Sequence, residues 1–186
     1  MESTKQKKKF ALPRVGARMV KSVLAVLLVA LAYEYLLGGR NACFACVGAI
    51  YGVGSVLQEG ARNGFNRFVG TLLGGLVVIP FYWLYANTPL SVPASIYLAL
   101  GAFCTIYLNV LCGTYNAIQP GSIVYFVVIF TQPPETYIGY TIARVIDTGV
   151  GVLIGLLVNI SYHLPKTPKE EPVPQHSVIH EIVHEQ

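Results

Sequence analysis

The longest interval without lysine runs from Lys21 to Lys166, and only eight of the 22 charged residues lie within residues 22–161. Hydrophobic residues make up 54% of the chain and charged residues 12%, about half the charge of an ordinary soluble domain. Several apolar stretches approach the roughly 20 residues that a helix needs to cross a hydrocarbon core of about 30 Å. We therefore predict an all-α integral membrane protein.

Apolar runs bounded by Gly, Pro, Asn and charged residues predict six transmembrane helices. We interpret the first run as an uncleaved helix, because it continues through Ala32-Tyr33-Glu34-Tyr35 without a small-residue cleavage site. We expect a basic tail at 1–19, a six-helix domain at 20–162 and a tail containing Pro and His at 163–186, with no folded domain outside the bilayer. The predicted spans are 20–38, 42–57, 67–86, 92–111, 117–131 and 138–162.

The basic residues indicate the orientation in the membrane. With both termini in the cytoplasm, eleven of the thirteen basic residues are cytoplasmic, including Arg62 and Arg67 in the second predicted loop. This distribution follows the positive-inside rule and predicts an N-in, C-in topology in the bacterial cytoplasmic membrane. Beside a membrane span, the basic N-terminal tail is expected to contact anionic lipids rather than nucleic acid.

Two segments share the pattern Arg-x-x-x-Thr-x-x-Gly, at residues 67–74 and 144–151, which are 77 residues apart. Asn41-Ala42 and Asn116-Ala117 recur at a spacing of 75. These matches place the first three predicted helices in register with the last three. Because each half has an odd number of spans, the halves would form a 3+3 inverted repeat, as in many secondary transporters. Chance similarity between apolar helices is the alternative.

Arg144 and Asp147 lie within the sixth predicted helix, about 10 and about 15 Å past its outer end. Their spacing places both on one helix face. An Asp at that depth costs at least about 2.5–3.5 kcal/mol on insertion scales, so we expect it to face the bundle interior or a wet cavity. The two residues could form a structural pair or take part in transport, since both roles require burial.

Further polar residues could line a substrate or ion pathway. Arg67 is expected in the first turn of the third helix, where a snorkelling anchor is the alternative. Asn116 and Gln119 precede Pro120, which starts either a half-helix aimed into the bundle or an ordinary interfacial helix. Glu34 is expected at the interface, paired with Arg40. The candidate pathway residues are Arg144, Asp147, Thr148, Arg67, Thr71, Gln119 and Asn116.

Glycines spaced four residues apart allow helix backbones to approach closely in lipid. We expect the residues of three such pairs to pack helices against each other, within the bundle or between protomers. They are Gly48, Gly52, Gly70, Gly74, Gly151 and Gly155.

Two patterns resemble metal sites. Cys43-x-x-Cys46 lacks two further convergent ligands, because Cys104 and Cys112 belong to the fourth helix. His180-Glu181-Ile-Val-His184 matches the zinc-protease pattern, but a solvated and partly helical tail is the simpler interpretation. We predict no metal, no cofactor and no enzymatic activity.

Three segments resemble the membrane domain of the fusaric acid resistance-like (FUSC) and aromatic acid exporter family. They are Asn66-Arg67-x-x-Gly70-Thr71-x-x-Gly74-Gly75, Arg144-x-x-Asp147-Thr148-x-x-Gly151 followed by Val158-Asn159, and Lys21-Ser22-x-Leu24-Ala25. The similarity extends over about residues 14–162. It implies a six-helix unit that exports aromatic carboxylic acids or related organic anions, with relatives among dimeric plant anion channels. Many members carry a cytosolic domain after the sixth helix, where this sequence has a short tail containing His.

These observations predict an efflux transporter for small organic anions, with protons as a further partner. A unit of this size and glycine content is expected to form a homo-oligomer. A non-transporting membrane scaffold and a passive organic-anion channel are the alternative functions. Neither the substrate nor the location of the pore, within or between protomers, follows from the sequence.

Overall fold

The computed structural model describes residues 16–87 and 93–161, and all regular secondary structure in these ranges is helical. The all-helical prediction is confirmed. The basic cluster before Gly16 and the tail with His180 and His184 lie outside the described residues. The helices are α1 (Ala17–Tyr35), α2 (Cys43–Gly52), α3 (Leu57–Asn87), α4 (Ala94–Leu111), α5 (Ile118–Thr131) and α6 (Tyr137–Ser161), with a 3-10 turn η1 (Tyr115–Ala117) before α5.

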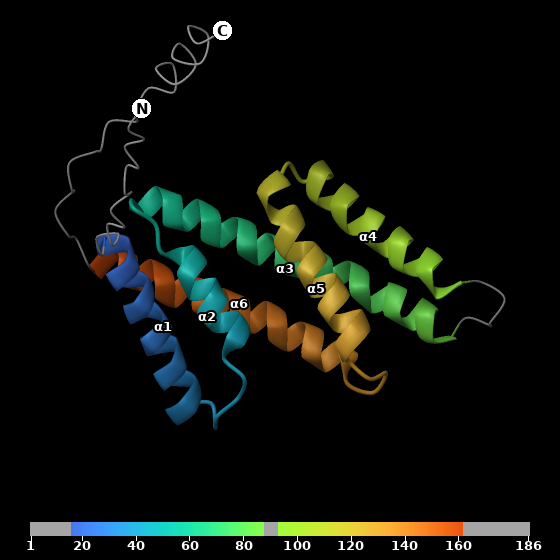
Figure 1. Cartoon of the computed structure of the whole chain (residues 1–186), viewed down its shortest axis with the longest axis horizontal. Helices are drawn as coiled ribbons and strands as arrows, with labels where there is room; N and C mark the ends of the chain where they lie inside the picture. Colours follow the sequence, from blue (N-terminus) through green and yellow to red (C-terminus); the bar gives the residue numbers. More distant parts are fainter. Residues whose placement is uncertain (1–15, 88–92, 162–186) are drawn as a thin grey trace, which may run out of the picture.

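Two of the described helices, α3 and α6, are long and apolar enough to cross a membrane. They have 31 and 25 residues, which correspond to lengths of about 46 and about 37 Å. In Figure 1 they extend across the molecule behind α2 and α5, while α1 and α4 lie at opposite sides. The two long helices therefore form the scaffold on which the shorter helices pack.

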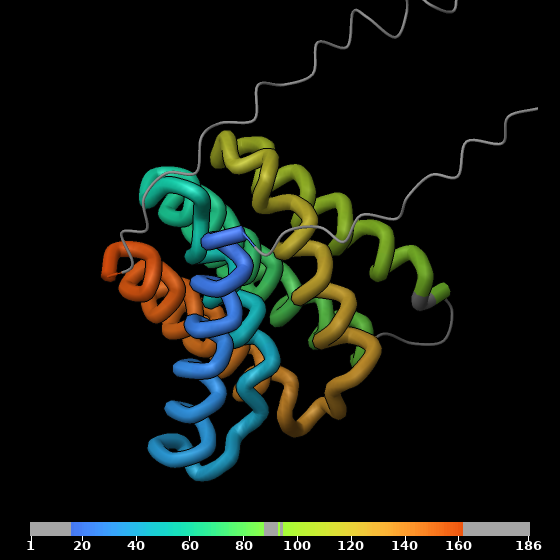
Figure 2. Tube along the Cα trace, turned by 60° about the vertical axis from the view of Figure 1, so that its left-hand side comes forward, coloured from blue at the N-terminus to red at the C-terminus, as the bar shows by residue number. Residues whose placement is uncertain are grey.

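The helices α2 and α5 are short, with 10 and 14 residues. Each lies alongside part of one long helix. In α2, methyl groups at Gly48 and Gly52 would lie 2.7 and 2.6 Å from the carbonyl oxygens of Thr148 and Val152, so α2 runs parallel to the second half of α6. In α5, Gly121 packs against Gly74 of α3. Figure 2 shows α1 with α2, and α4 with α5, as two helical hairpins beside the long helices.

The third helix begins ten residues earlier than predicted, at Leu57 rather than at residue 67. The predicted loop around Arg62 is instead an amphipathic part of α3, with Arg62 exposed and Gly60 and Gly64 buried. At its start, a carboxylate oxygen of Glu59 accepts a 2.8 Å hydrogen bond from the Ser55 amide. The charged residues therefore mark the exposed face of a helix and not a loop.

The buried hydrophobic residues form two clusters. One joins α3, α5 and the start of α6, where the rings of Tyr82 and Tyr137 stack at 4.2 Å between centroids. The other joins α1, α2 and α6 around Val29, Ala45 and Val158. Large apolar side chains also cover the outside of the long helices, including Leu76 and Leu153, which are 63% and 62% exposed. Such an outer surface suits a lipid environment.

Candidate functional site

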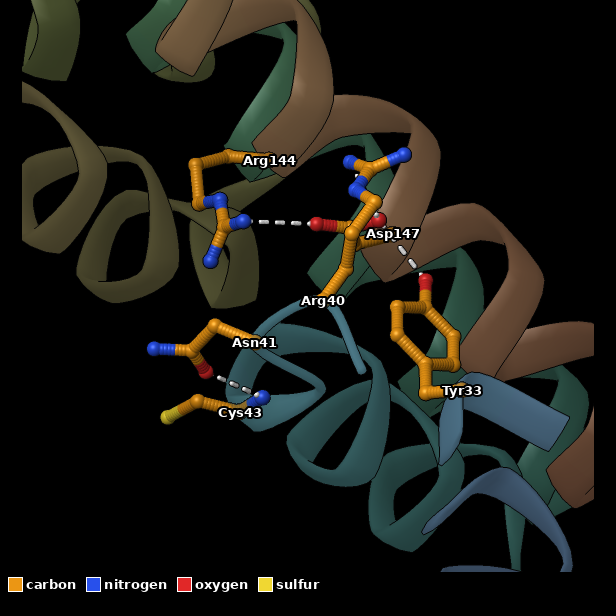
Figure 3. Close-up of polar contacts among 6 residues, drawn as sticks. All are labelled: Tyr33, Arg40, Asn41, Cys43, Arg144 and Asp147. Atoms are coloured by element: carbon orange, nitrogen blue, oxygen red, sulfur yellow. Dashed lines mark hydrogen bonds and ion pairs between the residues drawn. The ribbon is translucent and has the colours of Figure 1, made fainter. Parts of the chain in front are cut away.

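Asp147 is the most deeply buried charged residue of the described chain, with 1% of its surface exposed. Its Oδ2 lies 2.8 Å from Nη2 of Arg144, one helical turn earlier in α6. Arg144 is itself 6% exposed. The predicted spacing of three residues thus produces an ion pair inside the molecule, as Figure 3 shows.

Two residues from the first hairpin complete the surroundings of the Asp147 carboxylate. Tyr33 of α1 donates a 2.7 Å hydrogen bond from its hydroxyl to Oδ1, and Nη2 of Arg40 lies 3.4 Å from the same oxygen (Figure 3). The expected partner of Arg40 was Glu34, but Glu34 is exposed and Arg40 pairs with Asp147. One carboxylate therefore has a phenol and two guanidinium groups as neighbours.

The loop between α1 and α2 directs Arg40 toward α6. Gly38 and Gly39 adopt φ values of 64° and 75°, in the left-handed region that favours glycine, and they turn the chain sharply after α1. Asn41 lies just before α2, and its side-chain oxygen accepts a 2.9 Å hydrogen bond from the Cys43 amide, which closes an Asx turn (Figure 3). In this loop, Gly38 and Gly39 form the turn, Arg40 makes the ionic contact with Asp147, and the next residue forms the Asx turn that precedes α2.

Aromatic rings enclose the guanidinium of Arg144. Its carbon lies 4.8 Å from the ring centroid of Phe44 and 4.7 Å from that of Tyr140. In the part of the chain that the structure describes, Nε of Arg144 and the hydroxyl of the fully buried Thr148 have no hydrogen-bond partner. Unused donors therefore remain beside an ion pair that is already formed.

Arg67 is the eleventh residue of α3, so the prediction that it lies in the first turn of the third helix is wrong. It is 5% exposed, which does not fit the alternative of a snorkelling anchor at the membrane surface. Its guanidinium lies 5.5 Å from the ring centroid of Tyr51, and its Nε has no hydrogen-bond partner. Within residues 16–87 and 93–161, no carboxylate lies within ion-pair distance of it. The hydroxyl of Thr71 donates a 2.9 Å hydrogen bond to the backbone carbonyl oxygen of Arg67, in the same helix.

Asn116 lies in η1, Gln119 lies in the first turn of α5, and both residues are exposed. They make no polar contact with Arg144 or Asp147. Pro120 is the third residue of α5 and packs against Gly70 of α3. The structure therefore brings Arg144, Asp147 and Thr148 together, with Asn116 and Gln119 elsewhere.

The glycines expected at packing surfaces all lie at close contacts between helices. Gly70 and Gly74 of α3 face the backbone of Ala117 and Gly121, while Gly151 and Gly155 of α6 face the carbonyl oxygens of Ala45 and Ala49. Gly48 and Gly52 contact α6 from the α2 side. Any larger residue at these positions would push the short helices away from the long ones.

The sequence did not predict the contacts of Tyr33 and Arg40 with Asp147, nor the burial of Lys21. Lys21, counted among the cytoplasmic basic residues at the start of the first predicted span, is 8% exposed in α1, and its Nζ lies 3.3 Å from Oδ1 of Asn159 in α6. An amide in an otherwise apolar stretch was the available signal for Asn159. Tyr33 carries no comparable signal, because a tyrosine near the end of an apolar helix is ordinary at a membrane interface.

No group of three or more His, Cys, Asp or Glu side chains suited to a metal occurs among the described residues. Cys43 and Cys46 are free thiols. The buried polar side chains of the candidate site are therefore guanidinium groups, one carboxylate and hydroxyl groups. Such groups suit the binding of an anion or a proton.

The sequence model of the family described as "Aromatic acid exporter family member 1" matches residues 13–162. The chain belongs to this family of exporters, as the motifs in α3 and α6 predicted. It is a membrane protein of a transporter family and not of an enzyme family.

Among curated proteins, the chain is similar to the UPF0421 protein OB2406 of Oceanobacillus iheyensis, with 22% identity over 170 residues. The alignment covers 90% of this chain and 46% of the relative, so the chain spans less than half of that protein's length. No solved structure matches the chain.

Proposed function

We propose that the protein is a transporter that exports aromatic carboxylic acids or other small organic anions across the bacterial cytoplasmic membrane. Membership of the aromatic acid exporter family carries this proposal. The buried Arg144–Asp147 pair supports it, because ionisable residues deep in a membrane domain commonly belong to substrate or proton pathways.

The proposed topology has six membrane segments with both termini in the cytoplasm and an inverted repeat of three segments. Its support is a matching set of contacts: Gly74 of α3 packs on Gly121 of α5, and Gly151 of α6 packs on Ala45 of α2. In each case a short helix of one half covers the long helix of the other half.

In the proposed mechanism, buried cations attract the substrate carboxylate, and Asp147 exchanges a proton. A proton on Asp147 would remove the negative charge that holds Arg144, Arg40 and the hydroxyl of Tyr33 together. Neutralisation would loosen the contact between the first hairpin and α6. This coupling would link proton binding to a movement of α1 and α2.

A homo-oligomer is part of the proposal. Its support is the extent of exposed apolar surface on α3 and α6, including a groove lined by Phe65, Phe68, Leu153 and Leu156. The small residue Ala61 also lines this groove, and a small side chain favours close approach of a helix from a second copy.

The test is transport of radiolabelled 4-hydroxybenzoate into proteoliposomes, with and without an imposed pH gradient. We expect saturable uptake by the wild type that exceeds empty liposomes and responds to the gradient. Asp147→Asn is expected to lose gradient-driven accumulation while it keeps exchange of labelled for unlabelled substrate. Glu34→Gln, which removes an exposed carboxylate outside the cluster, is the matched control.

Two results would count against this account. If folded wild-type protein moved no organic anion, the scaffold function would replace the transporter. If uptake were present but Asp147→Asn kept full gradient-driven accumulation, the proposed proton coupling would be wrong. Steady current in planar bilayers without a pH gradient would instead identify a passive channel.

A further inference from the structure

The two long helices carry corresponding arginines in different charge environments. In residues 144–151, Arg144 is followed three residues later by Asp147, and the two form a 2.8 Å ion pair. In residues 67–74, Arg67 is followed three residues later by Gly70. The motif at residues 67–74 therefore has an arginine, as the motif at residues 144–151 does, but it lacks the carboxylate.

The two arginines come from opposite parts of one contact between antiparallel helices. Gly64 of α3 meets Val152 of α6, and further along α3 Gly75 meets Thr141. Arg67 lies near the first contact and Arg144 near the second. Both side chains are at least nine-tenths buried, so each guanidinium belongs to the interior of the bundle.

No side chain could replace Gly70 to supply the missing charge. A methyl group there would collide with the carbonyl oxygen of Ala117, and it would lie 2.8 Å from the Pro120 ring. Close packing of α5 on α3 thus excludes a carboxylate from the position equivalent to Asp147. The same packing brings the N-terminus of α5, the positive end of a 14-residue helix, within one turn of Arg67 along α3.

The surroundings of Arg67 hold the guanidinium without neutralising it. The ring of Tyr51 lies 5.5 Å away and stabilises a cation through its π face, yet it brings no charge. Nε of Arg67 has no hydrogen-bond partner within residues 16–87 and 93–161. A buried cation with an unused donor and no anion among the described residues is a binding site for an anion supplied from outside.

We infer that Arg67 binds the carboxylate of the transported organic anion, whereas Arg144 is neutralised internally by Asp147. This inference rests on the proposed function and deepens it by dividing the roles of the two arginines. The bound carboxylate supplies to Arg67 the negative charge that Asp147 supplies to Arg144. Planar guanidinium and carboxylate groups form two parallel hydrogen bonds, which favours carboxylates over spherical anions.

The test measures equilibrium binding of sodium benzoate to the full-length protein in detergent by calorimetry, with benzamide as the uncharged analogue. We expect Arg67→Gln to raise the dissociation constant for benzoate at least tenfold and Arg67→Lys to give an intermediate value. Arg62→Gln, which removes an exposed arginine of the same helix, is the matched control and is expected to bind as the wild type does.

A second variant tests the inference without removing the buried cation. Tyr51→Glu places a carboxylate beside Arg67, as Asp147 lies beside Arg144, and is expected to abolish benzoate binding while the protein stays folded. Tyr51→Gln has nearly the same side-chain shape as Tyr51→Glu but no charge, and it is expected to bind benzoate more tightly than Tyr51→Glu does, although less tightly than the wild type because the aromatic ring is lost. Because Tyr51 is 40% exposed, neither change buries a new group deeply.

The outcomes separate this inference from the proposed function. If the wild type binds and transports benzoate, and Arg67→Gln or the folded Tyr51→Glu variant binds it within twofold of the wild type, the assignment to Arg67 is overturned alone. A wild type that neither binds nor transports benzoate overturns both. Equal binding of benzamide and benzoate would show that the carboxylate is not recognised, and would also overturn the assignment.

Discussion

The hydroxyl of Tyr33 in α1 donates a 2.7 Å hydrogen bond to Oδ1 of Asp147 in α6, across 114 residues of sequence. Arg40 approaches the same oxygen from the loop after α1. Together these contacts fasten the first helical hairpin to α6 through one buried carboxylate. The hairpin and the charge cluster are therefore expected to respond to the same substitutions.

Loss of the Tyr33 hydroxyl should weaken that attachment. Hydrogen bonds to charged groups contribute about 1.5–3 kcal/mol, so Tyr33→Phe is expected to lower the free energy of unfolding by this amount. Unfolding in mixed micelles with increasing SDS measures the change. Tyr35→Phe removes an exposed hydroxyl two residues away and should leave stability within about 0.5 kcal/mol of the wild type. Equal stability of Tyr33→Phe and Tyr35→Phe would rule out a stabilising contact.

The Arg144–Asp147 pair should show strong energetic coupling. Removing one partner of a buried pair costs about 3–5 kcal/mol, because the other charge stays buried without compensation. Arg144→Gln and Asp147→Asn are each expected to destabilise the protein in this range. The double variant should be destabilised by clearly less than the sum of the two single changes. Additive effects in this double-mutant cycle would contradict a direct pair.

The close helix contacts at glycine should tolerate no added methyl group. In Gly151→Ala the new carbon would collide with Ala45, and overpacking of this kind costs about 1–3 kcal/mol. Gly139→Ala, in the same helix, meets no atom within 4 Å and should be neutral or stabilising by up to about 1 kcal/mol. Thermal unfolding in a mild detergent distinguishes the two, and an equal response would argue against the packing role of Gly151.

Much of the architecture could be predicted because apolar length and charge are local properties. The ends of α1, α4, α5 and α6 lie within about three residues of their predicted positions. The charge of Arg62 predicts a loop before the third helix, but the segment is an amphipathic part of α3 in which Gly60 and Gly64 are buried. The charges can be read from the local sequence, but the helix against which the glycines pack is known only from the tertiary structure.

The candidate site could be predicted only in part. The spacing of Arg144 and Asp147 within one helix fixes their mutual distance, so the pair was accessible from the sequence. Tyr33 and Arg40 reach Asp147 through a turn at Gly38-Gly39 and the placement of α1 on α6, which depend on tertiary packing. The same dependence explains why Asn116 and Gln119, polar and next to Pro120, are exposed rather than beside the pair.

The most direct test of the account is a comparison of labelled 4-hydroxybenzoate with 4-hydroxybenzamide in proteoliposomes that contain the wild-type protein. The two molecules differ mainly in charge, so the comparison asks whether the protein transports an anion. The account predicts saturable uptake of the benzoate, inhibited by unlabelled benzoate, and benzamide uptake no faster than in empty liposomes. Equal rates for both compounds, or no uptake of either by folded protein, would contradict it.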